Sequence, residues 1–510
     1  MVEKRSICLL CSLGCGLGIE VDGGGALGIE YYPEHPVNNG RLCPRGHYAL
    51  ELLNHPHRLY VPQIREGEGL RKASWDEAFN LLVSRIDETR KSYGPQSIGI
   101  VLDPNHTSEE VEAGLKLAEA IGTSNFSCSF SPEDYGLLKG LRGLSYSEVK
   151  AEELEEFNCI LVIGSLFESH PILAKRVIGA KYKKRGNSLI VVDPQRTNTA
   201  LFANIHLENR PGSEVLVLAG ILKSLIKGAS EEAVGKWGGG LKAGLENIPD
   251  EAISQASGIR MGQLAEAARV FNDSEKGVVI LSPGFGRHRG LPELAQLSIL
   301  LANLSKGEKG ILPLFTFGNA LGSYRAAPNP VKTFPQLIED ASGGGIKLLL
   351  LFGEDILSAY PSEAVQKAIG QVEFLVSAGL FPSEISKFAH IVLPSASWLE
   401  KSGTVSSFKG RDQVLEPVLP PPGIARPDLE IMSQLATRLG LAREQKAQRK
   451  AEKGISIDIQ GLIRGVANLP KEMTAEEEEA KEEYPYLLVG EENSIHFADG
   501  SITRNFGWAM

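Results

Sequence analysis

The chain has 510 residues, six cysteines and a formal net charge of −10 at pH 7. This length is too great for one hydrophobic core, and the acidic balance argues against a nucleic-acid partner, which requires a basic surface. No apolar run approaches the roughly 20 residues of a membrane helix, and the chain reaches Cys8 without a signal peptide. We therefore expect a cytoplasmic protein of several domains that does not insert into a membrane.

The first 58 residues are rich in cysteine and glycine and predict a small loop-and-strand domain around a metal centre. From Ser74 onward, apolar runs typical of buried strands alternate with amphipathic helices. Strands are expected at 97–104, 159–164, 189–194, 278–281, 346–353, 374–377 and 390–394, and helices near 74–86, 108–120, 214–226, 291–304 and 428–439. Buried strands that are each followed by a helix indicate parallel sheets covered on both faces, so the fold class is α/β.

The pattern changes near residue 442. Residues 443–453 are strongly charged, and residues 476–483 are almost all acidic. We expect 442–484 to form a solvated helix or linker, although the acidic run could also dock a basic redox partner. A short tail, 485–510, follows it.

Four cysteines, Cys8, Cys11, Cys15 and Cys43, have the spacing C-x2-C-x3-C-x27-C. A tight loop with three thiolates, joined by a fourth from a distance, is typical of a [4Fe–4S] cluster. The main alternative is structural zinc, whose sites usually have two C-x2-C pairs or C-x2-C with two histidines. The spacing favours the cluster.

Residues close to the four cysteines, and one further cysteine, have other expected roles. Arg45 is expected to raise the reduction potential of the cluster through its positive charge, and the alternative is an ordinary surface ion pair. His47, His55 and His57 lack ligand spacing and are interpreted as structural or solvated. Cys159 opens an apolar strand and is expected to be a buried core thiol.

Further motifs are spread along nearly the whole chain. They are 43–46 (CPRG), 57–62 (HRLYVP), 74–78 (SWDEA), 169–171 (SHP), 193–197 (DPQRT), 210–214 (RPGSE), 400–404 (EKSGT) and 410–413 (GRDQ). With the cysteine set, they resemble the molybdopterin oxidoreductases, which include formate dehydrogenases, nitrate reductases and the large iron–sulfur subunit of NADH–quinone oxidoreductase.

The resemblance implies a [4Fe–4S] domain at 1–58 and two doubly wound α/β lobes. One lobe is expected at 59–125 and 319–441, and the other is inserted into it at 126–318. Catalytic members hold a bis-pterin molybdenum or tungsten centre between the lobes, and a β-barrel domain closes over it. Residues 485–510 resemble only the first strands of that barrel, so we expect the barrel to be largely absent.

The sequence departs from the catalytic members at several positions. Formate dehydrogenases bind molybdenum through Cys or selenocysteine followed by His, whereas Cys128, near that position, has no following His. Phe315 stands where an Arg acts on formate, and Phe cannot pair a carboxylate as Arg does. The Asn-Pro expected after Gly164 and Gly353 is missing, and Glu214 replaces the usual Asp.

These departures favour an electron-relay subunit that keeps one [4Fe–4S] cluster and has no functional metal–pterin site, so no catalytic residue is assigned. Its expected partners are other redox subunits of iron–sulfur, flavin, hydrogenase or dehydrogenase type. The alternative is a catalytic molybdenum- or tungsten-pterin subunit of formate dehydrogenase or formylmethanofuran dehydrogenase type, with the barrel on another chain. The intact cysteine set disfavours a binding scaffold without a redox role.

Overall fold

The computed structural model describes residues 2–23, 25–227, 234–235, 240–282, 289–328, 330–353, 355–360, 362–408, 411–440 and 457–470. These residues form two compact units. Unit 1 contains the described residues within Met1–Phe130 and Phe317–Arg449, and unit 2 contains those within Ser131–Thr316 and Lys450–Ser494. Unit 2 therefore interrupts unit 1 in the sequence.

Unit 1 begins with a small antiparallel sheet in the order β1-β2-β3, followed by two short helices. Its elements are β1 (Val2–Ile7), β2 (Gly16–Asp22), β3 (Gly25–Glu30), α1 (Pro44–His47) and α2 (Ala49–Asn54). The sheet holds the loop between β1 and β2, which carries the first three cysteines.

The larger sheet of unit 1 has seven strands in the order β5-β4-β15-β14-β13-β6-β7. They are β4 (Gln63–Glu66), β5 (Gly69–Lys72), β6 (Ile98–Leu102), β7 (Phe126–Cys128), β13 (Leu348–Phe352), β14 (Phe374–Gly379) and β15 (Ile391–Pro394). The last five pair in parallel, whereas β4 is antiparallel to both β15 and β5. The carboxyl ends of the parallel strands therefore lie along one edge.

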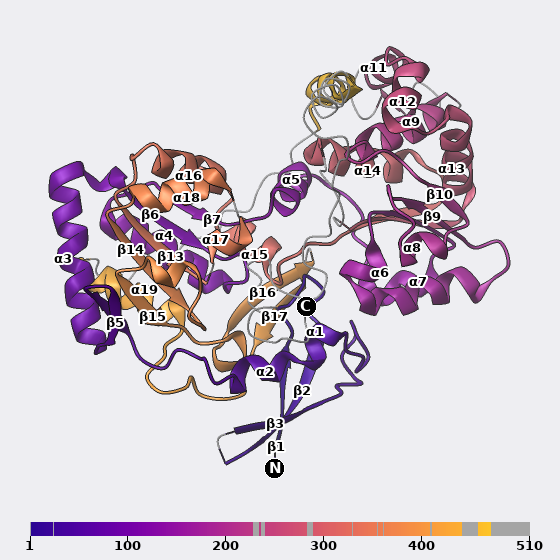
Figure 1. The fold of residues 1–510 in the computed structure, drawn as a ribbon. Helices are drawn as coiled ribbons and strands as arrows, with labels where there is room; N and C mark the ends of the chain where they lie inside the picture. Colours follow the sequence, from indigo (N-terminus) through magenta and orange to yellow (C-terminus); the bar gives the residue numbers. More distant parts are fainter. Residues whose placement is uncertain are drawn as a thin grey trace. The chain divides into compact units, whose positions relative to one another are not determined.

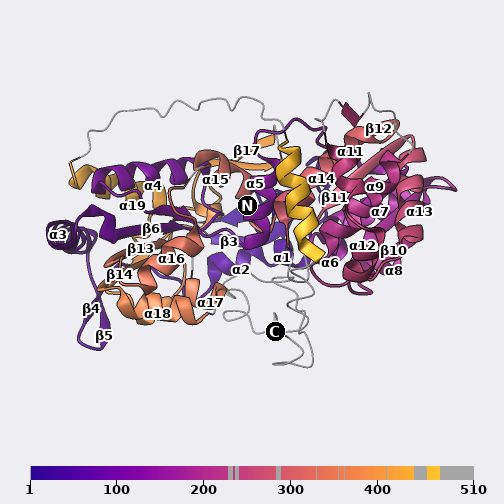
Figure 2. The same cartoon turned by 90° about the horizontal axis from the view of Figure 1, so that it is seen from above.

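Helices cover both faces of this sheet, as expected for strands that are buried along their whole length. They are α3 (Trp75–Tyr93), α4 (Ser108–Ile121), α15 (Ala320–Ala326), α16 (Phe334–Ser342), α17 (Ile356–Ala359), α18 (Glu363–Gln371) and α19 (Asp428–Arg438), with 3₁₀ turns η1 (Pro95–Ser97), η3 (Ile385–Lys387) and η4 (Trp398–Glu400). Figure 2 shows α4 and α19 on one face and α16 and α18 on the other. A two-stranded ribbon, β16 (Gly403–Phe408) and β17 (Arg411–Leu415), completes the unit.

Polar caps fix where the helices begin. The Ser74 side chain accepts a hydrogen bond from the Glu77 N–H at the start of α3. Thr107 and Glu110 form a reciprocal capping box at the start of α4, which ends at Gly122 in the left-handed conformation.

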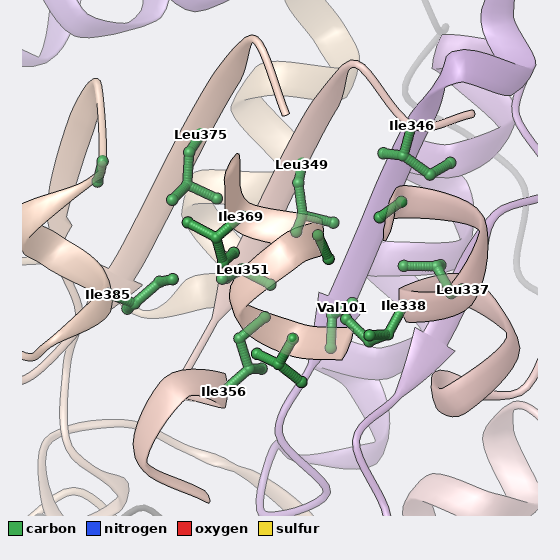
Figure 3. Close-up of a cluster of buried hydrophobic side chains, with 14 of the residues drawn as sticks. Val101, Leu337, Ile338, Ile346, Leu349, Leu351, Ile356, Ile369, Leu375 and Ile385 are labelled. Atoms are coloured by element: carbon green, nitrogen blue, oxygen red, sulfur yellow. The ribbon is translucent and has the colours of Figure 1, made fainter. Parts of the chain in front are cut away.

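An apolar cluster fills the space between the sheet and the α16–α18 layer (Figure 3). Leu349 and Leu351 point to the same face of β13 because side chains alternate along a strand. They pack with Leu337 and Ile338 of α16 and with Ile369 of α18. This burial stabilises the layer whose strand ends carry the polar residues described below.

Unit 2 contains a five-stranded parallel sheet in the order β10-β9-β8-β11-β12. Its strands are β8 (Cys159–Ile163), β9 (Ser188–Val192), β10 (Ile205–Leu207), β11 (Lys276–Leu281) and β12 (Glu308–Pro313). Its helices are α5 (Pro132–Leu141), η2 (Ala151–Glu156), α6 (Leu166–Ser169), α7 (Pro171–Lys183), α8 (Asn198–Leu201), α9 (Glu214–Ile226), α11 (Leu241–Glu246), α12 (Asp250–Ser257), α13 (Met261–Asp273) and α14 (Leu291–Leu304). Figure 1 shows α9, α13 and α14 on one face of the sheet and α6 and α7 on the other.

The structure confirms the expected strands and helices, with ends that differ by a few residues for most of them. It corrects the start of the inserted lobe. Residues 126–128, expected in that lobe, form β7 and pair with β6 in unit 1. The isolated triplet is too short to reveal its sheet from sequence.

Sequence analysis expected a solvated helix or linker at 442–484; for residues 459–470 the helix is confirmed, but the expected solvation is wrong. Residues 459–470 are helical, and Leu462, Val466 and Leu469 are buried in unit 2. Their spacing of three and four residues forms an apolar helix face, which the charged flanking residues obscured. The acidic run and the expected barrel remnant lie outside the described residues.

No helix in the described part of the chain combines the length and the apolar character needed to cross a membrane. The expected cytoplasmic location stays a prediction.

Candidate functional site

The loop between β1 and β2 carries three of the four cysteines. Ile7 pairs with Gly16 across the two strands, and the Cys8 N–H donates to the Cys15 carbonyl oxygen at 2.8 Å. The loop is therefore closed at its base. Cys8, Cys11 and Cys15 are all buried within it.

Cys43 is the N-cap residue of α1, and Pro44 occupies the first helical position. The Cys43 carbonyl oxygen accepts a hydrogen bond from the His47 N–H at 2.9 Å. A Cβ atom built at Gly46 would lie 3.9 Å from the Cys8 sulfur, so the first turn of α1 lies against the three-cysteine loop. Cys43 is half-buried, unlike the other three cysteines.

The four thiols interact electrostatically with one another. Burial raises the pKa of Cys8, Cys11 and Cys15, and every pair among the four thiols adds to these increases through charge repulsion. A metal centre bound there would displace the thiol protons and relieve this repulsion.

This donor set fits an iron–sulfur cluster better than one zinc ion. Within the described residues, no group of three or more His, Cys, Asp or Glu side chains is arranged to hold a single metal ion. Zinc requires its thiolates at about 2.3 Å from one atom. In a [4Fe–4S] cluster, each thiolate binds a different iron atom, so the sulfur atoms lie further apart.

Arg45 is buried beside the thiols, with 6% of its surface exposed. Burial lowers the pKa of Arg45, but the charges of Cys11 and Cys43 and a hydrogen bond to Cys43 outweigh it, and the net pKa is raised. The alternative interpretation of Arg45 as a surface ion-pair residue is therefore wrong. Of the nearby histidines, His47 and His57 are exposed.

The chain that returns from unit 2 lies directly against the cysteine loop. A Cβ atom at Gly318 would lie 2.5 Å from the Leu9 carbonyl oxygen and 2.6 Å from the Leu9 Cα, so only glycine fits there. The Gly318 N–H donates to Asn105 Oδ1 at 2.7 Å, and the next residue, Asn319, donates from its side chain to the His106 carbonyl oxygen. These contacts connect the loop to the carboxyl end of β6.

A group of buried charges lies beyond that end of β6. Lys401 Nζ is 2.7 Å from both carboxylate oxygens of Glu110, and His106 Nε2 is 3.0 Å from Asp428 Oδ2. His106 Nδ1 is 2.7 Å from the Asp103 carbonyl oxygen. Both ring nitrogens thus face acceptors, a geometry that favours the imidazolium.

The pKa values agree with this geometry. Burial lowers the pKa of His106, but the hydrogen bond to Asp428 and the charge of Glu110 outweigh it, and the net pKa is raised. Burial raises the pKa of Asp103. The pairs hold α4, α19 and the segment after η4 together, and we assign them a structural role.

Cys128 ends β7 and is buried. Burial, with a further contribution from the charge of Asp103, raises the pKa of its thiol to about 12. Phe315 is 1% exposed in unit 2, where it fills the core. The two positions compared with formate dehydrogenase therefore carry a neutral thiol and an apolar side chain. Cys159 is a buried thiol, as expected.

Unit 2 gathers polar residues at the carboxyl ends of β8 and β9. Asp193 accepts hydrogen bonds from the Ser165 hydroxyl at 3.1 Å and from the Gln195 N–H at 2.8 Å. Burial raises the pKa of Asp193 to about 6, although these hydrogen bonds oppose the increase. Such strand ends are where open α/β sheets bind ligands. Glu214, the last residue of the 210–214 motif, is buried, and its carboxylate accepts a hydrogen bond from Asn209 Nδ2 at 3.2 Å.

Sequence reasoning missed two residues that support the cysteine loop. Asn38 and His35 are buried and contact Gly16, which directly follows Cys15. The available signal was the Asn-Gly pair at positions 39 and 40, which predicts a tight turn just before Cys43.

Comparisons with known proteins agree with the motifs. The molybdopterin oxidoreductase family model matches residues 58–438, and the model of the molybdopterin oxidoreductase Fe4S4 domain matches residues 1–55. The alpha subunit of the F420-dependent formate dehydrogenase of Methanocaldococcus jannaschii is 30% identical over 479 residues, which cover 86% of this chain and 70% of that protein. Formate dehydrogenase H of Escherichia coli is 26% identical over 498 residues, or 86% of this chain and 68% of that protein.

Among solved structures, acetylene hydratase from Pelobacter acetylenicus superposes with a TM-score of 0.67 at 18% identity, over 86% of this chain and 69% of that one. This likeness concerns the fold alone. The two family models together span most of the sequence from the first strand to α19. The chain therefore belongs to the molybdopterin oxidoreductase family.

Proposed function

We propose that this chain is an electron-transfer subunit of a multi-subunit redox complex and holds one [4Fe–4S] cluster through Cys8, Cys11, Cys15 and Cys43. The observation that carries the proposal is the convergence of these four thiols from the β1–β2 loop and the N-cap of α1. A cluster held there would supply one-electron transfer. Support also comes from the match of residues 1–55 to the family's Fe4S4 domain.

The residues around the thiols have separate tasks in this proposal. Arg45 places a positive charge beside the thiolates and offsets part of their negative charge. The buried loop excludes water from three of the sulfur atoms, whereas Cys43 is half-buried. Cys43 therefore marks the side of the site that is open to an electron-transfer partner, which we propose to be another redox subunit.

The proposal assigns no metal–pterin chemistry to this chain. One observation supports that choice: Phe315 is a core side chain, and Phe cannot pair with a carboxylate as Arg does.

The relatives favour a second candidate. The formate dehydrogenase alpha subunit of M. jannaschii is 30% identical to this chain, which supports a catalytic molybdenum- or tungsten-pterin subunit. In that case, the polar strand ends around Asp193 and Ser165 are candidates for contacts with the pterin nucleotide.

The experiment compares three anaerobically purified proteins: the wild type, Cys43→Ala and Cys128→Ala. We expect the reduced wild type and Cys128→Ala to give the same electron paramagnetic resonance signal of a [4Fe–4S] cluster, and Cys43→Ala to lose it. Cys128→Ala is the matched control because it also removes one thiol, at a position outside the four-cysteine set. A wild type without iron would overturn the cluster assignment, and formate oxidation by the isolated wild type that Cys128→Ala abolishes would favour the catalytic candidate.

A further inference from the structure

The three-cysteine loop and the fourth cysteine are separated by 27 residues, so a tertiary contact must fix the position of Cys43 relative to the loop. The loop is closed by its own backbone bond. The side chain of Asn38 joins the loop to the segment before Cys43.

Asn38 is fully buried, and its amide bonds to the backbone of Gly16 at two points. Its Oδ1 accepts from the Gly16 N–H at 2.9 Å, and its Nδ2 donates to the Gly16 carbonyl oxygen at 3.0 Å. The side chain thus pairs with Gly16 as a neighbouring strand would. Gly16 directly follows the ligand candidate Cys15.

The same amide also reaches the other half of the site. Nδ2 donates to the Arg41 carbonyl oxygen at 2.8 Å, two residues before Cys43. The Arg41 N–H donates to the Asn38 carbonyl oxygen at 2.9 Å, and Asn39 and Gly40 both have positive φ, 47° and 76°. Asn38 therefore also anchors the tight turn that directs the chain to Cys43.

The backbone partners of this amide fix its orientation, and the amide in turn sets the tautomer of His35. His35 Nδ1 lies 2.9 Å from Asn38 Oδ1, which can only accept, so Nδ1 carries the proton. Although the Gly16 N–H is also 3.1 Å from Nδ1, a protonated nitrogen cannot accept, and that N–H bonds to Asn38 Oδ1. Reversing the amide would set Oδ1 against the carbonyl oxygens of Gly16 and Arg41, and Nδ2 against the Gly16 N–H. All four hydrogen-bonding positions of Asn38 are thus satisfied, as a buried amide requires.

We infer that Asn38 is a positioning residue for the iron–sulfur site. Its amide holds the Cys15 end of the loop against the turn that leads to Cys43, and this clamp sets the spacing of the four thiols. The inference rests on the proposed cluster. Asn38 touches no ligand sulfur in the contacts described, and it acts through the Gly16 and Arg41 backbones.

Asn38→Asp tests the clamp with almost no change in shape. A carboxylate cannot donate, so both bonds from Nδ2 are lost, and a negative charge faces two carbonyl oxygens. Substitutions that loosen the support of a metal ligand typically lower metal affinity by about 10- to 100-fold. We expect Asn38→Asp to hold less iron, to release it to a chelator at least about tenfold faster, and to show an altered resonance line shape.

Asn39→Gly is the matched control. It changes the adjacent, exposed asparagine at a positive φ that glycine adopts readily, so the turn is kept. We expect its iron content, chelator rate and line shape to equal those of the wild type. If Asn38→Asp does not fold, Asn38→Ser removes the amide without adding a charge, and the same losses are expected.

The two possible failures are distinguishable. An iron-loaded wild type together with an Asn38→Asp variant of equal iron content, chelator rate and line shape would overturn the clamp and leave the cluster in place. A wild type that binds no iron would instead overturn the proposed cluster, and the clamp with it.

Discussion

Arg58 and Glu400 form a buried two-point ion pair although they lie 342 positions apart in the sequence. Arg58 Nη2 lies 2.7 Å from Glu400 Oε2, and Nη1 lies 3.1 Å from Oε1. Arg58 Nη1 also donates to the Leu52 carbonyl oxygen in α2, and the Ser397 N–H donates to Glu400. The pair thus fastens the cysteine-bearing segment to η4 within unit 1.

The first prediction concerns this pair. Arg58→Met should destabilise unit 1 by about 3–5 kcal/mol, because it leaves a carboxylate buried without its partner. The double variant Arg58→Met/Glu400→Gln should recover part of that loss, since no buried charge remains. Urea unfolding measures both. As a control, Arg85→Ala at the exposed Arg85–Glu88 pair should change stability by less than about 1 kcal/mol. A similarly small effect of Arg58→Met would contradict the assigned role.

The second prediction concerns Arg45. Reduction adds negative charge to the cluster, and the buried guanidinium beside Cys43 stabilises that charge. Arg45→Ala should therefore lower the midpoint potential in a redox titration. Arg45→Lys should lower the midpoint potential much less, because the positive charge remains. An Arg45→Ala midpoint that is unchanged or higher would refute this effect.

The third prediction concerns Gly318. A methyl group there would meet the Leu9 backbone, which cannot rotate away as a side chain could. Gly318→Ala should destabilise the cysteine loop by about 1–3 kcal/mol and reduce iron content. Gly370→Ala in α18 is the control: no atom lies within 4 Å of its Cβ position, and alanine favours a helix. Thermal unfolding and iron analysis compare the two, and equal behaviour would argue against the close contact of Gly318 with Leu9.

The fourth prediction is a pH dependence from Asp193. Burial raises the pKa of its carboxyl from the ordinary 3.8 to about 6, so the folded protein binds this proton more tightly than the unfolded chain. The resulting stabilisation is complete below about pH 4 and is lost as the pH rises through 6. The difference between these two pKa values corresponds to about 3 kcal/mol in the free energy of unfolding.

Asp193→Asn removes the titrating group. The free energy of unfolding of the wild type should therefore fall by about 3 kcal/mol relative to the variant between pH 4 and pH 7. Urea unfolding at a series of pH values measures this difference. Parallel pH profiles for the two proteins would show that Asp193 titrates normally.

The cysteine set and the alternating elements could be predicted because each is encoded locally. Cys8, Cys11 and Cys15 lie within one loop, and the buried strands are continuous apolar runs. The membership of β7 in the sheet of unit 1 could not, because a three-residue strand is defined by its partner rather than by its own pattern.

The support of the site was hidden from the sequence for a similar reason. The bonds of Asn38 to Gly16 span 22 residues, and the contact of Gly318 with Leu9 requires the chain to return after the whole of unit 2. The burial of Arg45 likewise depends on the packing of α1 against the loop. Charged neighbours also masked the apolar face of the helix at 459–470.

We propose that the chain carries one [4Fe–4S] cluster and no metal–pterin centre. Elemental analysis of the anaerobically purified wild type, with iron, molybdenum and tungsten counted per chain, tests it most directly. We expect about four iron atoms per chain and neither molybdenum nor tungsten. The absence of iron, or about one molybdenum or tungsten atom alongside the iron, would contradict it.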